Sequence, residues 1–216
     1  MLQAVKQIIF AIAPYALIPP LVLSIARFRQ FPTALRLLSM HIWIAAVTEL
    51  LANLLWHWHV NNLFLLHIYT VEECGLLLWF YSYLLNAVFK RTVFLYVFAG
   101  FLVGAVLNSV FIQHLSQNNT YTRSVEAILI IVCAVAYFYR MLSETMLSQP
   151  ARSPYFWINT GLLIYFAASL LLFTMSNYIR GPQYKHLRQD IWTLHAFFTI
   201  VLYCFISIGL WKQPKK

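Results

Sequence analysis

Eight of the carboxylate, imidazole and amide side chains in the long apolar runs of this sequence are candidates for a functional site. They are Glu49, Asn53, His67, Glu72, Glu73, Asn108, Glu126 and His195. Glu72 and Glu73 are adjacent within the stretch LLHIYTVEECGLLLWFYSY. Carboxylates and imidazoles perform acid–base chemistry, hold metal ions and recognise charged ligands. We therefore asked which elements position these groups and what surrounds them.

The runs that carry these side chains are long enough to cross a lipid bilayer, which takes roughly 20 apolar residues. Seven spans are predicted, at residues 7–26, 35–57, 62–88, 92–113, 122–147, 154–178 and 190–211. The chain is 62% hydrophobic and 10% charged, whereas soluble domains are about 45–50% apolar and about 25% charged. We expect one domain over 1–216, an all-α integral membrane protein built as a seven-transmembrane-helix bundle.

Lysine and arginine residues near the span ends predict the orientation. With the N-terminus outside, the inner segments hold ten of them: Arg27, Arg29, Arg36, Lys90, Arg91, Arg140, Arg152, Lys212, Lys215 and Lys216. The outer segments hold five: Lys6, Arg123, Arg180, Lys185 and Arg188. Basic residues concentrate on the cytoplasmic side, so the N-terminus is predicted outside and the C-terminus in the cytoplasm. Because the net charge of +9 lies at span ends, it indicates topology and not nucleic-acid binding.

A rise of about 1.5 Å per residue places all eight polar side chains in the outer half of the bundle. Glu72 and Glu73 are the deepest, at roughly 15 Å from the outer end of their span. The inner half has few counterparts, mainly Asn159 and the pair Arg140 and Glu144. His41 lies near the inner end of the second span and is predicted to be structural.

Helical spacing brings some of these groups together. Glu49 and Asn53 are four residues apart and share a helix face. Tyr69 precedes Glu72 and Glu73 by three and four residues, so it is predicted to join the same polar network. In the first span, three prolines, Pro14, Pro19 and Pro20, are predicted to kink the helix.

Four glutamates in one membrane layer carry a large energetic cost. A charged side chain at mid-membrane costs roughly 2.5–3.5 kcal/mol on insertion scales, and such residues usually face the bundle interior and mark function. Arg123 is the one basic residue near them. Since crowding and desolvation disfavour the ionised carboxylate, we expect a protonated carboxyl, a bound cation, or contacts with His67 and His195.

Three interpretations of the layer remain open. It is a metal site, a hydrogen-bonded network that fixes helix packing, or a polar pocket for a small ligand. The candidate metal ligands are Glu72, Glu73, His67, His195, Glu49 and Glu126, and such donors suit zinc, iron or manganese. However, neither a Glu-x-x-His pair nor HExxH is present in these spans. A haem between His67 and His195 has no specific support, and retinal is excluded because no lysine lies within a span.

Several motifs resemble a known group of proteins. The motifs are Asn61-Asn62, His67-x-Tyr69-x-x-Glu72-Glu73, Phe156-Trp157-Ile158 with Gly161 and Tyr165, Ile191-Trp192-x-x-His195, and ISIGLWK near the end. The chain resembles short bacterial seven-transmembrane-helix proteins that are similar to membrane sensor modules associated with histidine kinases. The resemblance implies a bacterial cytoplasmic membrane and a signalling role, and it supplies no catalytic residues. We expect no kinase or other output domain after Lys216.

These patterns support three hypotheses about function. The first is a receptor or sensor whose outer Glu/His/Asn layer binds a small ligand, proton or cation and signals through a cytoplasmic or membrane partner. The second is a membrane enzyme or metalloprotein that acts on a lipid-like substrate with the same layer. The third is a proton-coupled transporter, which the lack of internal repeats disfavours.

Overall fold

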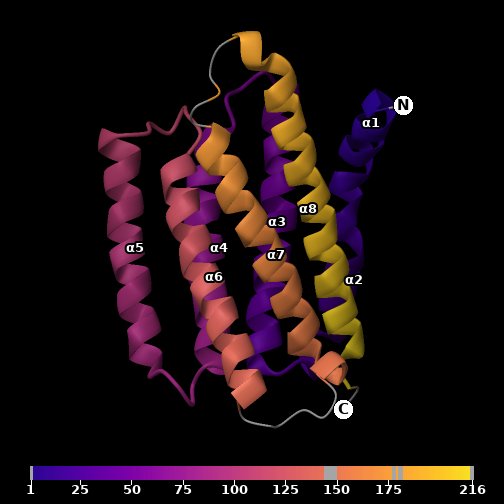
Figure 1. Ribbon diagram of the computed structural model, residues 1–216, viewed down its shortest axis with the longest axis vertical. Coiled ribbons are helices and arrows are strands. Elements are labelled where there is room, and N and C mark those ends of the chain that lie inside the picture. Colours follow the sequence, from indigo (N-terminus) through magenta and orange to yellow (C-terminus); the bar gives the residue numbers. More distant parts are fainter. Residues whose placement is uncertain (1, 144–149, 177–178, 180–181, 215–216) are drawn as a thin grey trace.

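The computed structural model describes residues 2–143, 150–176, 179 and 182–214, and every regular element in these ranges is helical. The elements are α1 (Leu2–Ile12), η1 (Ala13–Leu17), α2 (Ile18–Arg27), η2 (Phe28–Gln30), α3 (Thr33–His57), α4 (Leu63–Leu84), α5 (Arg91–Phe111), α6 (Thr120–Ser143), η3 (Pro150–Arg152), α7 (Pro154–Ser176), η4 (Pro182–Tyr184) and α8 (Lys185–Lys212), as Figure 1 shows. Seven of the described helices are long and apolar enough to cross a membrane. The predicted all-α bundle of seven spans is confirmed.

Four described span ends differ from the prediction by four or five residues, and two of them belong to the first span, which runs over Gln3–Gln30. The third span ends at Leu84 and not at residue 88, because the chain turns there, and the Leu85 carbonyl accepts hydrogen bonds from the amides of Val88 and Phe89. The last span begins at Lys185, five residues before the predicted start. Residues 144–147 and 177–178 of two predicted spans, and with them Glu144, lie outside the described residues.

The first span is continuous but changes its helical pitch. It runs over Gln3–Gln30, and its middle is the 3₁₀ segment η1, which has Pro14 at its start. Pro19 and Pro20 lie in the first turn of α2, where a missing amide hydrogen costs little. The predicted distortion of this span is therefore present as a tightened segment between two α-helices.

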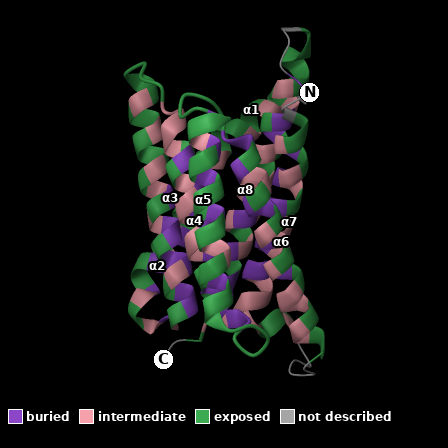
Figure 2. Cartoon of the chain, turned by 90° about the vertical axis from the view of Figure 1, so that its left-hand side faces the viewer, coloured by how far each residue is buried: buried purple, intermediate pink, exposed green. Residues whose placement is uncertain are grey.

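Six of the seven spans form a closed ring. Going round it, α3 packs on α4, α4 on α6, α6 on α7, α7 on α8, and α8 and α3 both pack on the first span. Helix α5 stands outside the ring against α4 and α6, at the edge of the bundle in Figure 1. Exposed residues dominate the outer surface in Figure 2, and many of them are large and apolar. Such a surface suits a lipid environment.

The chain termini lie at opposite ends of the bundle, which we call the N-terminal end and the C-terminal end (Figure 1). At the C-terminal end, two arginines satisfy the last carbonyls of helices. Arg27 donates to the carbonyls of Leu210 (2.9 Å) and Trp211 (3.0 Å) in α8. Arg140 donates to the Leu84 carbonyl at the end of α4. These basic residues therefore also anchor helix ends to neighbouring spans.

Candidate functional site

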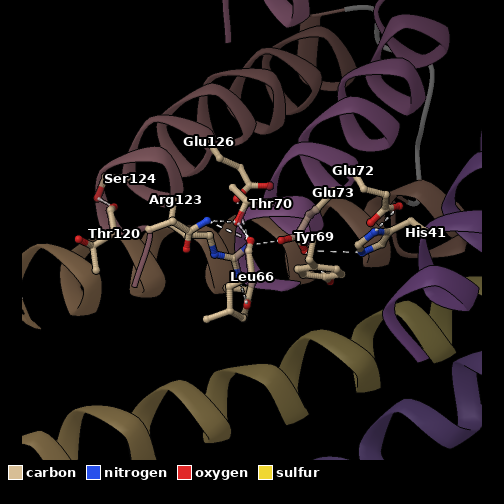
Figure 3. A network of polar contacts seen from close by, with 12 residues as sticks. His41, Leu66, Tyr69, Thr70, Glu72, Glu73, Thr120, Arg123, Ser124 and Glu126 are labelled. Carbon is tan, nitrogen blue, oxygen red and sulfur yellow. Dashed lines mark hydrogen bonds and ion pairs between the residues drawn. The ribbon is translucent and has the colours of Figure 1, made fainter. Parts of the chain in front are cut away.

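The centre of the ring holds a buried group of ionisable side chains, which we call the ion cluster: His41, Glu72, Glu73, Arg123 and Glu126. It joins three helices, α3, α4 and α6, as Figure 3 shows. The Glu73 side chain is 2% exposed and the Glu126 side chain is fully buried. Glu73 lies halfway along α4, so the cluster sits near the middle of the bundle.

Arg123 is the hub of the ion cluster. Its Nη1 donates to a carboxylate oxygen of Glu73 and, at 3.0 Å, to Glu126 Oε2. Its Nη2 donates to the Tyr165 hydroxyl on α7 at 3.3 Å. Arg123 precedes Glu126 by three residues, so the two share one face of α6. One guanidinium thus holds two carboxylates that would otherwise repel each other.

His41 lies between the two adjacent glutamates. Its Nδ1 is 3.5 Å from Glu72 Oε1, and its Nε2 is 3.6 Å from Glu73 Oε1. Both distances exceed those of a good hydrogen bond, so the interaction is mainly electrostatic. Within the described residues, neither Glu72 oxygen has a hydrogen-bond partner. His41 was predicted near the inner end of its span, apart from the glutamates; the structure places it beside them.

Tyr69 contacts the cluster as its spacing predicts. Its hydroxyl donates to Glu73 Oε1 at 3.1 Å, and its ring lies under the Arg123 guanidinium, 5.7 Å from ring centre to Cζ. The Tyr69 hydroxyl is therefore a second hydrogen-bond donor to the Glu73 carboxylate, beside Arg123.

His67 bonds to groups outside the ion cluster, so the alternative in which it contacts the glutamates does not hold. His67 Nε2 is 3.0 Å from the Gln117 carbonyl, and Nδ1 is 2.8 Å from the Ser109 hydroxyl. A carbonyl only accepts, so Nε2 carries a hydrogen and donates it to Gln117. Both nitrogens are used to tie α4 to the end of α5 and its following loop, which leaves neither for a haem or a metal.

Asn108 also belongs to a separate network. Its amide donates to Gln113 Oε1 (3.2 Å) and to the Thr122 hydroxyl (3.0 Å). Gln113 in turn donates to Thr120 at 2.8 Å. These buried bonds close the connection between α5 and α6. Asn108 therefore fixes this connection and does not contact the ion cluster.

A cavity of about 470 Å³ opens inside the ring at the N-terminal end. Residues of all six ring spans line it, and none comes from α5. The lining residues are Phe10, Ala13, Pro14, Leu17, Ala45, Thr48, Glu49, Ala52, Asn62, Leu65, Leu66, Tyr69, Arg123, Tyr165, His195, Ala196, Thr199 and Tyr203. Because Tyr69 and Arg123 belong to this wall and also contact Glu73, the cavity adjoins the ion cluster directly.

Two other predicted site residues line the cavity, and a third is bonded to one of them. Glu49 lines it from α3 and accepts a hydrogen bond of 3.3 Å from Asn53, one turn away, as their spacing predicts. His195 lines it from α8, and its Nε2 is 3.4 Å from the Tyr165 hydroxyl. Since Tyr165 also accepts from Arg123, His195 reaches the ion cluster through one intervening side chain.

The predicted layer is thus divided into parts. Glu72, Glu73 and Glu126 meet in the ion cluster, Glu49 and His195 line the cavity, and the amide of Asn108 and the ring of His67 belong to connections at the N-terminal end. Sequence reasoning left His41 and Arg123 out of the site. For Arg123 the signal was its spacing of three residues from Glu126, which puts a cation and a carboxylate on one helix face.

In the part of the chain that the structure describes, the potential metal ligands are not arranged as a metal centre. No group of three His, Cys, Asp or Glu side chains there is arranged to hold a metal ion. The position between Glu73 and Glu126 is filled by the guanidinium of Arg123. The two carboxylates therefore share one internal cation.

The fold and site define a bundle of seven membrane-length helices with a cavity, lined by apolar and polar side chains, next to a buried ion cluster. No protein family, curated protein or solved structure matches the chain. The cavity and the ion cluster are therefore the features that bear on its function.

Proposed function

We propose that this protein is a receptor-like membrane protein that binds a small ligand in the cavity at the N-terminal end and signals through a partner. The N-terminal end faces outside and the C-terminal end faces the cytoplasm, in a bacterial cytoplasmic membrane. The ion cluster lies between the ligand and the cytoplasmic half.

The observation that carries this proposal is the lining of the cavity by all six ring spans. Its volume of about 470 Å³ lies within the range of about 300–1,000 Å³ typical of small-molecule sites. A ligand held there contacts helices far apart in sequence, so its binding energy favours one arrangement of the ring over another.

The route from the ligand to the bundle centre passes through Arg123. Tyr165 contacts Arg123 from the cavity wall, and Tyr69 contacts Glu73. A ligand that takes the hydrogen bond of either tyrosine changes how the guanidinium is shared between Glu73 and Glu126. Since these carboxylates lie on α4 and α6, such a change alters the packing of two central helices.

The test is to fill the cavity with a side chain. Ala52→Phe places an aromatic ring at the cavity wall, whereas Ala99→Phe adds the same ring to an exposed position of α5. Purified protein is screened by thermal unfolding against amino acids, organic acids, amines and nucleosides. We expect at least one compound to raise the midpoint of the parent and of Ala99→Phe, and to lose most of this effect with Ala52→Phe.

Two results would contradict the proposal. If compounds that stabilise the parent stabilise Ala52→Phe to the same degree, the cavity is not the binding site. If no compound stabilises the parent, the cavity is a packing feature and the receptor proposal fails.

The orientation is tested with reporter fusions at the C-terminus. Basic residues at the C-terminal end of the bundle predict that this end is cytoplasmic. A fluorescent protein fused after Lys216 is therefore expected to fluoresce, and alkaline phosphatase fused there is expected to be inactive. Active alkaline phosphatase at this position would reverse the assignment of the cavity to the outside.

A further inference from the structure

The charges and rings of the cavity wall identify the class of its ligand. We infer that the cavity binds an organic cation, a substituted ammonium group, and this inference rests on the proposed ligand-binding function. Three features of the wall support it: an unneutralised carboxylate, an internally compensated cation, and several aromatic faces.

The unneutralised carboxylate is Glu49. It lies on α3 in the cavity wall, and its hydrogen bonds come from the uncharged Asn53 amide. Among the described lining residues, the one permanently charged cation is Arg123. A ligand cation beside Glu49 therefore meets a negative charge that has no basic side chain in contact with it in the described ion pairs.

The charge of Arg123 does not offset Glu49. Arg123 contacts both Glu73 and Glu126, so the three side chains together carry a net negative charge when both carboxylates are ionised. If Glu126 is protonated, the three together are neutral, and Glu49 still leaves the wall negative. The set of Glu49, Arg123, Glu73 and Glu126 is therefore negative in either protonation state of Glu126, which favours a cation and disfavours an anion.

Aromatic side chains add a second source of attraction for a cation. Phe10, Tyr165 and Tyr203 line the cavity from α1, α7 and α8. The faces of aromatic rings attract ammonium groups, and the attraction grows when the group is desolvated. Rings from three helices together with one carboxylate make a site for an ammonium group whose substituents are apolar.

The experiment compares choline with its uncharged carbon isostere, in which the quaternary nitrogen is replaced by carbon. Binding to the detergent-purified full chain is measured by calorimetry. We expect choline to bind at least tenfold more tightly than the isostere. Glu49→Gln is expected to remove this preference, while Asp190→Asn retains it, because Asp190 pairs with Lys6 outside the cavity wall.

Each alternative result has a defined meaning. Equal binding of choline and its isostere, or an unchanged preference in Glu49→Gln, overturns the cation inference. If a neutral or anionic compound binds instead and depends on Ala52, the inference fails while the proposed function stands. If nothing binds in a way that depends on Ala52, both fail.

A substituted ammonium group occurs both in free organic cations and in lipid headgroups. A second experiment distinguishes these two sources. The choline measurement is repeated in nanodiscs of phosphatidylcholine and of phosphatidylglycerol. Weaker choline binding in phosphatidylcholine supports the inference with a lipid headgroup as the occupant, since the headgroup competes. Equal binding in both lipids supports it with a free cation as the ligand.

Discussion

Replacing Arg123 by methionine is expected to lower the apparent free energy of unfolding by about 3–5 kcal/mol, the usual cost of breaking a buried ion pair from one side. Methionine retains much of the length of the side chain but leaves Glu73 and Glu126 without their shared cation. Both carboxylates are almost completely buried, so they lose a charged partner that few other groups can replace. Unfolding in mixed micelles, driven by increasing amounts of a denaturing detergent, measures the effect.

The matched control is Arg152→Met. Arg152 lies exposed in η3, and exposed substitutions usually change stability by less than about 0.5 kcal/mol. An Arg123→Met variant that is no less stable than Arg152→Met would show that the ion cluster is not held by this guanidinium.

A rescue variant separates the loss of charge from the loss of packing. Adding Glu73→Gln and Glu126→Gln to Arg123→Met removes the two uncompensated carboxylates together with their partner. We expect this triple variant to recover most of the lost stability, since replacing a complete buried ion group is often nearly neutral. If it is as unstable as the single variant, packing and not charge causes the loss.

The seven spans were predictable because their length and composition are set by the thickness of a bilayer. Contacts along one helix were predictable for a similar reason, since residues three and four apart share a face. The bond from Asn53 to Glu49 and the bond from Tyr69 to Glu73 are examples. These are properties of single helices, and the sequence pattern of one helix is sufficient to predict them.

Contacts between helices were less predictable. Depth estimated along each helix axis separately put His41 closer to the inner membrane surface than Glu73. In the structure the two side chains meet. Such estimates ignore helix tilt, which is about 20° on average in membranes. His67 was misassigned because one of its partners is the backbone carbonyl of Gln117. A residue pattern carries no signal for a backbone partner in a distant loop, so such a bond is visible only in the folded chain.

Packing within the ring of helices depends on two glycines that belong to the sequence motifs but had no assigned role. Gly161 and Gly209 both lie where α7 and α8 pack together. A Cβ added at Gly161 would lie 2.6 Å from the Phe205 Cβ, and one added at Gly209 would lie 2.5 Å from the Ile158 Cγ1. Small residues let membrane helices approach closely, so these glycines hold together two walls of the cavity.

Gly209→Ala is accordingly expected to destabilise the protein by about 1–3 kcal/mol, the usual cost of overpacking. The added methyl group also meets the Pro154 carbonyl oxygen at 2.8 Å, and this backbone atom cannot move aside as the end of a flexible side chain can. The apparent free energy of unfolding in mixed micelles is again the measurement. Because α7 and α8 carry Tyr165 and His195, we also expect a loss of ligand-induced stabilisation.

The control on α5 is predicted to change stability in the opposite direction. A Cβ added at Gly100 has no heavy atom within 4 Å, so Gly100→Ala removes the entropic disadvantage of glycine in a helix without a clash. It is expected to stabilise the protein by about 0.5–1 kcal/mol. If both variants change stability in the same direction, helix propensity decides the effect and the close approach of α7 to α8 does not. Opposite signs would show that the close approach of α7 to α8 sets the cost at Gly209.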